Sequence, residues 1–181
     1  MSTALLEVEN LCVDYPVRGN WFGKKRFLHA VRDVSFELRP GETLGLVGES
    51  GCGKSTLGRA LTGLVEPSSG SIRLQGVEIA GAKNASARKK MRGKYQMIFQ
   101  DPYGSLNPRL TIFDSLDEVL RMVPDAPRRA DRRDKAAELL TKVGLKPESL
   151  DRYPHQFSGG QRQRIGIARS LAANPLFIVA D

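Results

Sequence analysis

The sequence is poor in the residues that organise disulfide-rich, zinc-binding and membrane-spanning proteins. Its 181 residues include two cysteines, Cys12 and Cys52, and two histidines. Without a CxxC pair or a Cys/His cluster, a disulfide framework and a zinc module are excluded, and a reducing compartment is expected. The longest purely apolar run, Leu176–Ala180, is far shorter than the roughly 18 residues of a membrane helix. The amino terminus also lacks the basic segment of a signal peptide.

What the sequence does have is enough apolar residues for a core, and an excess of positive charge. Apolar residues make up 40% and charged residues 27%, which favours a folded domain over disorder. The net charge of +8 suits an anionic partner such as nucleic acid, a membrane surface or a phosphate ligand, or simply a solvated basic surface. The basic residues concentrate in 83–94 and, diluted by aspartates, in 128–135.

The pattern of apolar residues predicts a mixed α/β protein with a helical insertion. Strands are expected at 5–14, 34–38, 43–47, 72–79 (a hairpin around Gln75-Gly76), 95–100 and 176–180, and the stretch 16–27 is expected to be a loop or hairpin tip. Helices are expected at 56–65, from Thr111 to 121, from Asp131 to a stop at Gly144, and up to 173. Strand patterns are missing between 101 and 174. The chain therefore divides into an α/β core (1–100), a helical part (101–174) and a returning strand (175–181).

A phosphate-binding loop follows the expected strand at 43–47. Residues 48–55, GESGCGKS, fit the pattern G-x-x-x-x-G-K-[ST], in which the glycines let successive N–H groups turn toward an anion. The helix that begins near Ser55 adds the positive end of its dipole. Lys54 places a compact charge on the β- and γ-phosphates, and the Ser55 hydroxyl can ligate Mg²⁺. Cys52 is interpreted as a small passenger residue of this loop, with a redox role as the alternative.

A second glycine-containing turn, SGGQ at 158–161, opens the last expected helix. Its free N–H groups, serine hydroxyl and glutamine amide offer another anion site, although simple capping of the helix would also explain them. Downstream, the apolar strand ends in Asp181. An apolar strand that ends in aspartate, after a phosphate loop, is the arrangement that holds the Mg²⁺ of a P-loop ATPase.

Taken in order, these motifs resemble the ATP-binding subunit of ABC transporters over nearly the whole chain. Residues 48–55 resemble the Walker A motif, Gln100 in FQDP the Q-loop, SGGQ the signature motif, and FIVAD at 177–181 the Walker B motif. Phe157 stands where leucine is more usual before the signature. The resemblance implies a P-loop NTPase core of the ABC type, with an antiparallel β part and the helical insertion.

The resemblance also implies a role for each motif residue. Tyr15 would stack on adenine, and Lys54, Gln100 and Asp181 are the expected catalytic residues. Mg²⁺ would be held by Ser55, Gln100 and Asp181. ATP would be bound by Tyr15, Gly48, Ser50, Gly51, Cys52, Gly53, Lys54, Ser55 and Thr56 of one subunit and by Ser158, Gly159, Gly160 and Gln161 of an opposing subunit. Two such subunits would enclose two ATP molecules head to tail.

The sequence around the motifs resembles that of dipeptide and oligopeptide importers, in particular that of their second ATPase subunit. It includes YGSLNPR at 103–109 and YPHQ at 153–156. This implies ATP-driven peptide import at the cytoplasmic face of the cell membrane, with permease subunits, a second ATPase subunit or another copy, and indirectly a solute-binding protein as partners. Nickel and glutathione importers are alternatives, as are an ABC ATPase acting on nucleic acid or the ribosome and a non-hydrolysing nucleotide-binding module. Binding of nucleic acid is not expected.

The family pattern continues beyond the position at which this sequence ends. Its next elements are a glutamate that polarises the attacking water and, later, a histidine that senses the γ-phosphate. His29 and His155 stand in the wrong places to replace that histidine. We therefore expect the 181-residue chain to be C-terminally incomplete, to bind ATP weakly and to hydrolyse it negligibly by itself.

Overall fold

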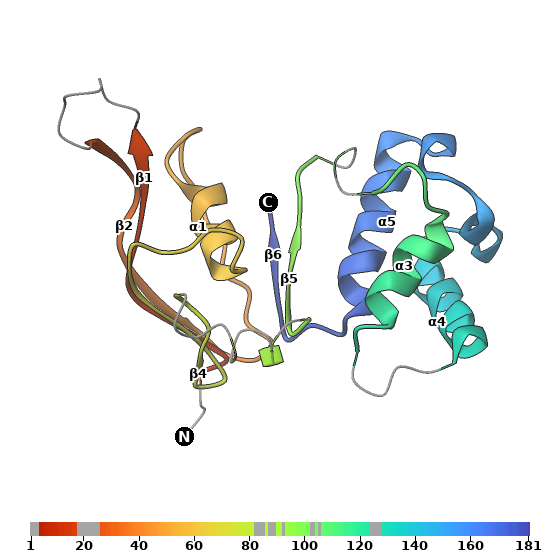
Figure 1. Cartoon of the computed structure of the whole chain (residues 1–181), viewed down its shortest axis with the longest axis horizontal. Helices are drawn as coiled ribbons and strands as arrows, with labels where there is room; N and C mark the ends of the chain where they lie inside the picture. Colours follow the sequence, from red (N-terminus) through yellow and green to blue (C-terminus); the bar gives the residue numbers. More distant parts are fainter. Residues whose placement is uncertain are drawn as a thin grey trace. The chain divides into compact units, whose positions relative to one another are not determined.

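The computed structural model describes residues 4–17, 26–81, 86, 90–91, 93–101, 104, 106–123 and 128–181. The chain divides into two compact units, Met1–Arg92 and Gly93–Asp181, which are drawn from red to yellow-green and from green to blue in Figure 1. Most of the basic cluster at 83–94, and Tyr103 and Ser105 of the importer-like segment, lie outside the described residues.

The first unit is built on an antiparallel sheet. Its strands, in the spatial order β2-β1-β3-β4, are β1 (Leu6–Val17), β2 (Arg26–Leu38), β3 (Ser69–Leu74) and β4 (Val77–Glu78). Leu6 and Val8 of β1 stand opposite Leu74 and Ile72 of β3, and all four side chains are at most 1% exposed. The alternation of apolar and polar residues thus gives one buried face, as the sequence predicts.

The turns of this sheet follow local sequence signals, whereas the strand lengths do not. The predicted hairpin at 72–79 is confirmed, because β3 pairs with β4 and Gln75 and Gly76 both have positive φ, 50° and 74°, as a tight hairpin turn requires. The first two strands are longer than predicted. Pro16-Val17 and Arg26-Phe27 are paired strand residues rather than loop, and residues 18–25 lie outside the described residues.

The segment 43–47 is not the buried strand that its composition suggests. It has no regular secondary structure, Leu44 and Leu46 are 53% and 52% exposed, and Val47 is 95% exposed. A strand exists only where a neighbour accepts and donates its backbone hydrogen bonds. Among the strands of the described residues, none pairs with this segment. The prediction from β-branched, apolar composition was therefore wrong in this structure.

The helix after the phosphate loop is α1 (Lys54–Leu61). It starts two residues before and ends four residues before the predicted helix at 56–65. Its end coincides with Thr62, whose hydroxyl donates to the Gly58 carbonyl at 2.9 Å, and with Gly63, which has a φ of 69°. Leu57 and Leu61 are each 6% exposed, so α1 turns its apolar face inward.

The second unit combines a small parallel sheet with a group of helices. It contains β5 (Tyr95–Ile98), α3 (Ile112–Leu120), α4 (Arg129–Lys142), the 3-10 helices η2 (Pro147–Asp151) and η3 (Pro154–Gln156), α5 (Gly159–Ala172) and β6 (Phe177–Ala180). The core between the helices includes the completely buried Ile112, Leu116, Leu140 and Ile165. Among the helices in the described ranges, none is both long and apolar enough to cross a bilayer.

Most helix ends in this unit lie where capping residues predict them. The Thr111 hydroxyl accepts the Asp114 N–H at 3.1 Å and starts α3, and Gly144, with a φ of 73°, follows the end of α4. The start of α4 differs from the prediction, since Arg128 and not Asp131 is its N-cap. Asp131 lies in the first turn instead, where a carboxylate is stabilised by the helix dipole without capping the helix.

Several arginines of the basic cluster at 128–135 have structural partners. Asp117 of α3, whose side chain is completely buried, is paired with Arg132 of α4 and with Arg121. Burial raises the pKa of Asp117, but hydrogen bonds from the two guanidinium groups outweigh it, so the pKa is lowered. Arg129 and Arg133 lie over the Phe113 ring, at 5.5 and 5.0 Å. Several basic side chains of this cluster therefore contact other residues of the helical unit, in addition to any contact with solvent or an anionic partner.

Candidate nucleotide-binding site

The loop before α1 has the backbone geometry of a phosphate-binding loop. Gly51 and Gly53 have φ values of 83° and 100°, a region that other residues enter only at a cost. At Gly53 a side chain is also excluded by space, because an added Cβ would lie 2.2 Å from the backbone oxygen of Ala30 in β2. The loop is thus held against the neighbouring strand, and two of its glycines are required by conformation and close packing.

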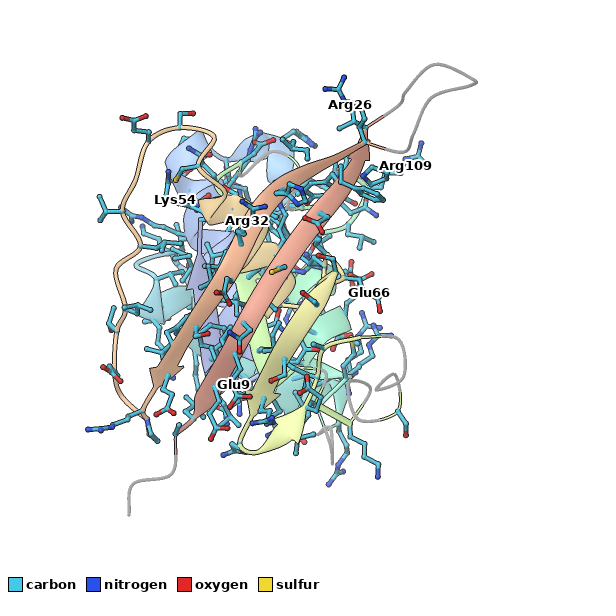
Figure 2. All side chains as sticks on the ribbon, turned by 90° about the vertical axis from the view of Figure 1, so that its left-hand side faces the viewer. Glu9, Arg26, Arg32, Lys54, Glu66 and Arg109 are labelled. Atoms are coloured by element: carbon cyan, nitrogen blue, oxygen red, sulfur yellow. The ribbon has the colours of Figure 1, made fainter. Side chains whose placement is uncertain are left out.

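Lys54 folds back over this loop. Its Nζ donates to the backbone oxygens of Gly48 and Glu49, at 2.8 and 2.6 Å, and lies 3.5 Å from the Cys52 Sγ. Figure 2 labels Lys54 in the part of the first unit where β2 carries Arg32. The acceptors on Lys54 Nζ are neutral carbonyls, so phosphate oxygens would form stronger, charge-assisted hydrogen bonds with the same ammonium group. The geometry fits an anion-binding lysine.

The beginning of α1 adds an electropositive helix end to the loop. Gly53 is the N-cap without a side-chain cap, and the first turn, which includes Ser55 and Thr56, contains no acidic residue. The Gly53 carbonyl accepts the Leu57 N–H at 2.8 Å, so the N–H groups before Leu57 precede the first helical hydrogen bond and face out of the helix end. Ser50, at the tip of the loop, is exposed. These features suit a bound anion.

Tyr15 lies in the same unit, near the end of β1 and opposite Leu28 of β2. It is partly buried, and its stacking on adenine stays a prediction. The preceding residue, Asp14, accepts a hydrogen bond from His29 Nδ1 at 2.6 Å, and this bond is the main cause of the lowered pKa of the Asp14 carboxyl.

In the second unit, Gln100 and Asp181 lie at one edge of the parallel sheet. β5 and β6 pair in parallel, with Ile98 opposite Ala180, and the Asp181 N–H donates to the Ile98 carbonyl at 3.0 Å. Gln100 follows Ile98 by two residues, and both Gln100 and Asp181 are exposed. The carboxyl ends of parallel strands therefore bring the two predicted Mg²⁺ ligands to the same edge, as expected from their positions after the strands.

These residues fit Mg²⁺ better than a metal that needs a cage of protein ligands. In the part of the chain that the structure describes, no group of three or more His, Cys, Asp and Glu could hold a metal. Mg²⁺ usually keeps several water molecules and binds through one or two carboxylates together with substrate phosphates. Within the second unit, the carboxylate of Asp181 and the neutral side-chain oxygen of Gln100 match that requirement.

The signature turn opens α5 as a capping box. The Ser158 Oγ accepts the Gln161 N–H at 3.3 Å, and the Gln161 Oε1 accepts the Ser158 N–H at 3.0 Å. The structure thus contains the helix cap that was one of the two interpretations of this turn from the sequence. Phe157, in the position before the signature, is 4% exposed and lies under the Arg152 guanidinium at 4.6 Å, so it fills a core position as leucine would.

The two glycines of the signature are not explained by the fold. Neither Gly159 nor Gly160 has a positive φ, and an added Cβ on either would meet no atom within 4 Å. Glycine in a helix costs up to about 1 kcal/mol relative to alanine. The fold of the chain does not require glycine at these two positions. Glycines with open space around them are expected where another group approaches the backbone closely.

Comparison with known proteins identifies the family. The family described as "ABC transporter" matches residues 31–181. The chain belongs to the ABC transporter family. The resemblance drawn from the motifs is confirmed. The roles of the individual site residues remain predictions.

The similar curated proteins are ATP-binding subunits of transporters. The chain is 50% identical over 182 residues to "Probable peptide ABC transporter ATP-binding protein y4tS" of Sinorhizobium fredii, covering all of this chain and 51% of that protein. It is 52% identical to the "Glutathione import ATP-binding protein GsiA" of Pectobacterium atrosepticum, over 98% of this chain and 28% of that protein. With the "Di/tripeptide transport ATP-binding protein DppF" of Pseudomonas aeruginosa the identity is 48%, over 98% of this chain and 54% of that protein. The chain thus spans about half the length, or less, of the curated relatives it matches.

Solved structures confirm the predicted fold. The ATP-binding cassette MJ0796, described as dimeric, in a post-hydrolysis state and bound to ADP and Pi, is 29% identical with a TM-score of 0.83, over 97% of this chain and 73% of that chain. The cbiO1 protein of Clostridium perfringens, described as part of the ABC transporter complex cbiONQ, is 26% identical with a TM-score of 0.73, over 98% of this chain and 65% of that chain. The α/β, P-loop ABC ATPase fold is therefore established for this chain.

Proposed function

We propose that this chain is part of the ATP-binding and ATP-hydrolysing subunit of an ABC importer for dipeptides and oligopeptides. The observation that carries the nucleotide-binding part is Lys54, held by two carbonyls at the mouth of a loop whose Gly51 and Gly53 adopt left-handed conformations. The substrate class is supported by relatives at 48–50% identity that are named as peptide or di/tripeptide transport proteins.

In this proposal, the residues of the chain bind and orient the nucleotide. The Lys54 ammonium and the N–H groups from Gly51 to Thr56 neutralise and hold the phosphates, and Tyr15 stacks on the base. Ser55, Gln100 and Asp181 hold Mg²⁺, which neutralises phosphate charge when it is bound. Positioning and electrostatic stabilisation of this kind are the main contributions of a protein to phosphoryl transfer.

The signature turn acts on the nucleotide of an opposing subunit. The open space above Gly159 and Gly160 gives access to the N–H groups at the start of α5, and the Ser158 hydroxyl and the Gln161 amide can exchange their capping bonds for phosphate contacts. The dimeric state named for the MJ0796 cassette supports a head-to-tail pair with two enclosed ATP molecules. The partner is a second copy or a second ATPase subunit.

The remaining partners follow from the substrate class. The subunit binds peripherally, at the cytoplasmic face of the cell membrane, to integral permease subunits, and an extracytoplasmic solute-binding protein delivers the peptide. A purification of the protein carrying this chain from membranes should retrieve the permease subunits after mild detergent extraction. Recovery of the protein free of any membrane protein under those conditions would contradict this assembly.

Titration with a fluorescent ATP analogue tests the nucleotide site. Lys54→Ala should weaken binding at least 10-fold, because charge-assisted hydrogen bonds to phosphate contribute about 1.5–3 kcal/mol each. Lys135→Ala, which removes an exposed lysine of α4, is the control of equal charge change and should bind like the wild type. Equal affinities for all three proteins would refute the assignment of the loop.

Glutathione import is the second candidate, because the relative GsiA is 52% identical. The two candidates are separated by uptake of a radiolabelled tripeptide and of radiolabelled glutathione in cells that lack their own importers. Peptide import would be supported if excess dipeptides inhibit the uptake of the tripeptide and excess glutathione does not. The opposite competition pattern would support glutathione import.

A further inference from the structure

Two hydrogen bonds from different elements hold the backbone immediately before Gln100. At the end of β5, the Ile98 carbonyl accepts the Asp181 N–H at 3.0 Å. The next carbonyl, that of Phe99, accepts the side-chain amide of Gln163 at 3.2 Å. Gln163 belongs to α5 and lies two residues after the signature motif. The segment that carries Gln100 is thus hydrogen-bonded both to Asp181, which follows β6, and to α5, the helix that begins with the signature turn and is called the signature helix below.

The chemistry of the second bond fixes its direction. A carbonyl oxygen can only accept, so the Gln163 Nε2 must face Phe99 as the donor. Phe99 lies beyond the last paired residue of β5, and its carbonyl is therefore outside the sheet ladder. The Gln163 amide supplies the partner that a neighbouring strand supplies elsewhere.

The packing of α5 against β5 places Gln163 at this end of the strand. Helix and strand are in contact and lie side by side in Figure 1. At the opposite end, an added Cβ on Gly93, just before β5, would lie 3.8 Å from the Cβ of Ala173, just after α5. The helix therefore runs antiparallel to the strand, and the start of α5 and the carboxyl end of β5 lie at the same end of this layer.

We propose that Gln163 is a positioning residue, whose amide holds the Phe99 carbonyl and thereby sets the position of Gln100 relative to Asp181 and to the signature turn. This inference rests on the proposed function, in which Gln100 and Asp181 bind Mg²⁺. The held carbonyl and the Cα of Gln100 belong to the same planar peptide unit, so loss of the bond releases the Gln100 side chain from its place. A shift of the signature helix is in turn transmitted to the Mg²⁺ ligand through this bond.

The consequence that can be measured is the gain in ATP affinity caused by Mg²⁺. Gln163→Glu keeps the shape of the side chain but replaces the amide donor by an acceptor, whereas Gln163→Lys restores a donor. In the protein carrying this chain, ATP affinity is titrated with Mg²⁺ and with EDTA. Gln163→Glu should reduce the Mg²⁺-dependent gain about 2- to 13-fold, the range expected for one hydrogen bond, and leave the affinity in EDTA unchanged. Gln163→Lys should recover most of the gain.

A double-mutant cycle separates positioning from a general effect on folding. If Gln163 acts through Gln100, Gln163→Glu should have no further effect on the Mg²⁺-dependent gain in a Gln100→Ala background. Arg164→Ala, at the next and exposed position of α5, is the control and should keep the wild-type gain. Additive effects of Gln163→Glu and Gln100→Ala, or a wild-type gain in Gln163→Glu, would overturn the inference.

The same titration distinguishes failure of this inference from failure of the proposed function. If the wild-type protein binds no ATP with or without Mg²⁺, the proposed function is wrong. If the wild type shows a Mg²⁺-dependent gain that none of the Gln163 variants alters, only the positioning role is wrong. Unfolding curves of all variants, recorded without nucleotide, should show one cooperative transition, as in the wild type, so that each variant is shown to be folded.

Discussion

Replacing Gly160 by alanine should stabilise the fold and at the same time remove the function of the signature turn. Gly160 is exposed at the second residue of α5 and has helical backbone angles, and an added methyl group would meet no atom within 4 Å. Alanine at such a position should raise the free energy of unfolding by about 0.5 kcal/mol, because it restricts the unfolded chain and suits the helix. In the proposed dimer, the same methyl group would occupy the space through which a phosphate of the opposing nucleotide reaches the backbone N–H groups.

Gly53→Ala is the contrasting substitution. There the φ of 100° costs an alanine about 1–2 kcal/mol, and the overlap with the Ala30 oxygen, 2.2 Å from the new Cβ, adds to it. Urea unfolding measures the stability of both variants, and sedimentation with ATP and Mg²⁺ measures dimer formation. Gly160→Ala should be as stable as the wild type or more stable and fail to dimerise. A Gly160→Ala variant that dimerises normally around ATP would refute the interpretation of this turn.

Three further outcomes concern the helical unit. Asp117→Asn should destabilise the protein by about 3 kcal/mol, the low end for a broken buried ion pair. The substitution leaves Arg132, whose side chain is 12% exposed, without the Asp117 carboxylate, whereas the side chain of Arg121 is 55% exposed and can be solvated by water. Urea unfolding at neutral pH measures this, and a loss below 0.5 kcal/mol would contradict the pairing. The pKa of Asp117 is lowered in the fold, so the stability that its charge contributes is complete above the ordinary carboxyl pKa near 3.9 and is lost as the pH falls through the lower pKa of the folded state. Between pH 5 and pH 2, the free energy of unfolding should therefore decrease less steeply in Asp117→Asn than in the wild type. Leu140→Ala, at a completely buried core position, should cost about 2–5 kcal/mol, and an unchanged urea midpoint would contradict the assigned core.

Features determined by local sequence could be predicted from the sequence, and features that need a distant partner could not. The cap at Thr111, the stop at Gly144 and the turn at Gln75-Gly76 depend on residues within one turn, and the structure has all three. The segment 43–47 has strand composition, but its state depends on a neighbouring strand that no local pattern specifies. For the same reason, β1 and β2 extend beyond their predicted ends because each supplies the hydrogen-bond partner of the other.

The candidate site divides in the same way. The phosphate loop and the signature turn are contiguous motifs, so the sequence locates them and the backbone angles of the loop agree. The link from Gln163 to Phe99 joins residues 64 positions apart, and the pairing of Asp117 with Arg132 joins α3 to α4. No spacing or periodicity indicates such pairs.

The central claim, that each nucleotide is held by the phosphate loop of one subunit and the signature turn of another, is tested most directly by mixing two inactive variants. In the protein carrying this chain, the variants Lys54→Ala and Ser158→Ala, each purified alone, should fail to form ATP-containing dimers that hydrolyse ATP. In their mixed dimer, the intact Lys54 of one subunit meets the intact Ser158 of the other at one of the two sites. The equimolar mixture should therefore regain about a quarter of the wild-type sites, because half of randomly formed dimers are mixed and each has one intact site. A mixture as inactive as its two components would contradict the account.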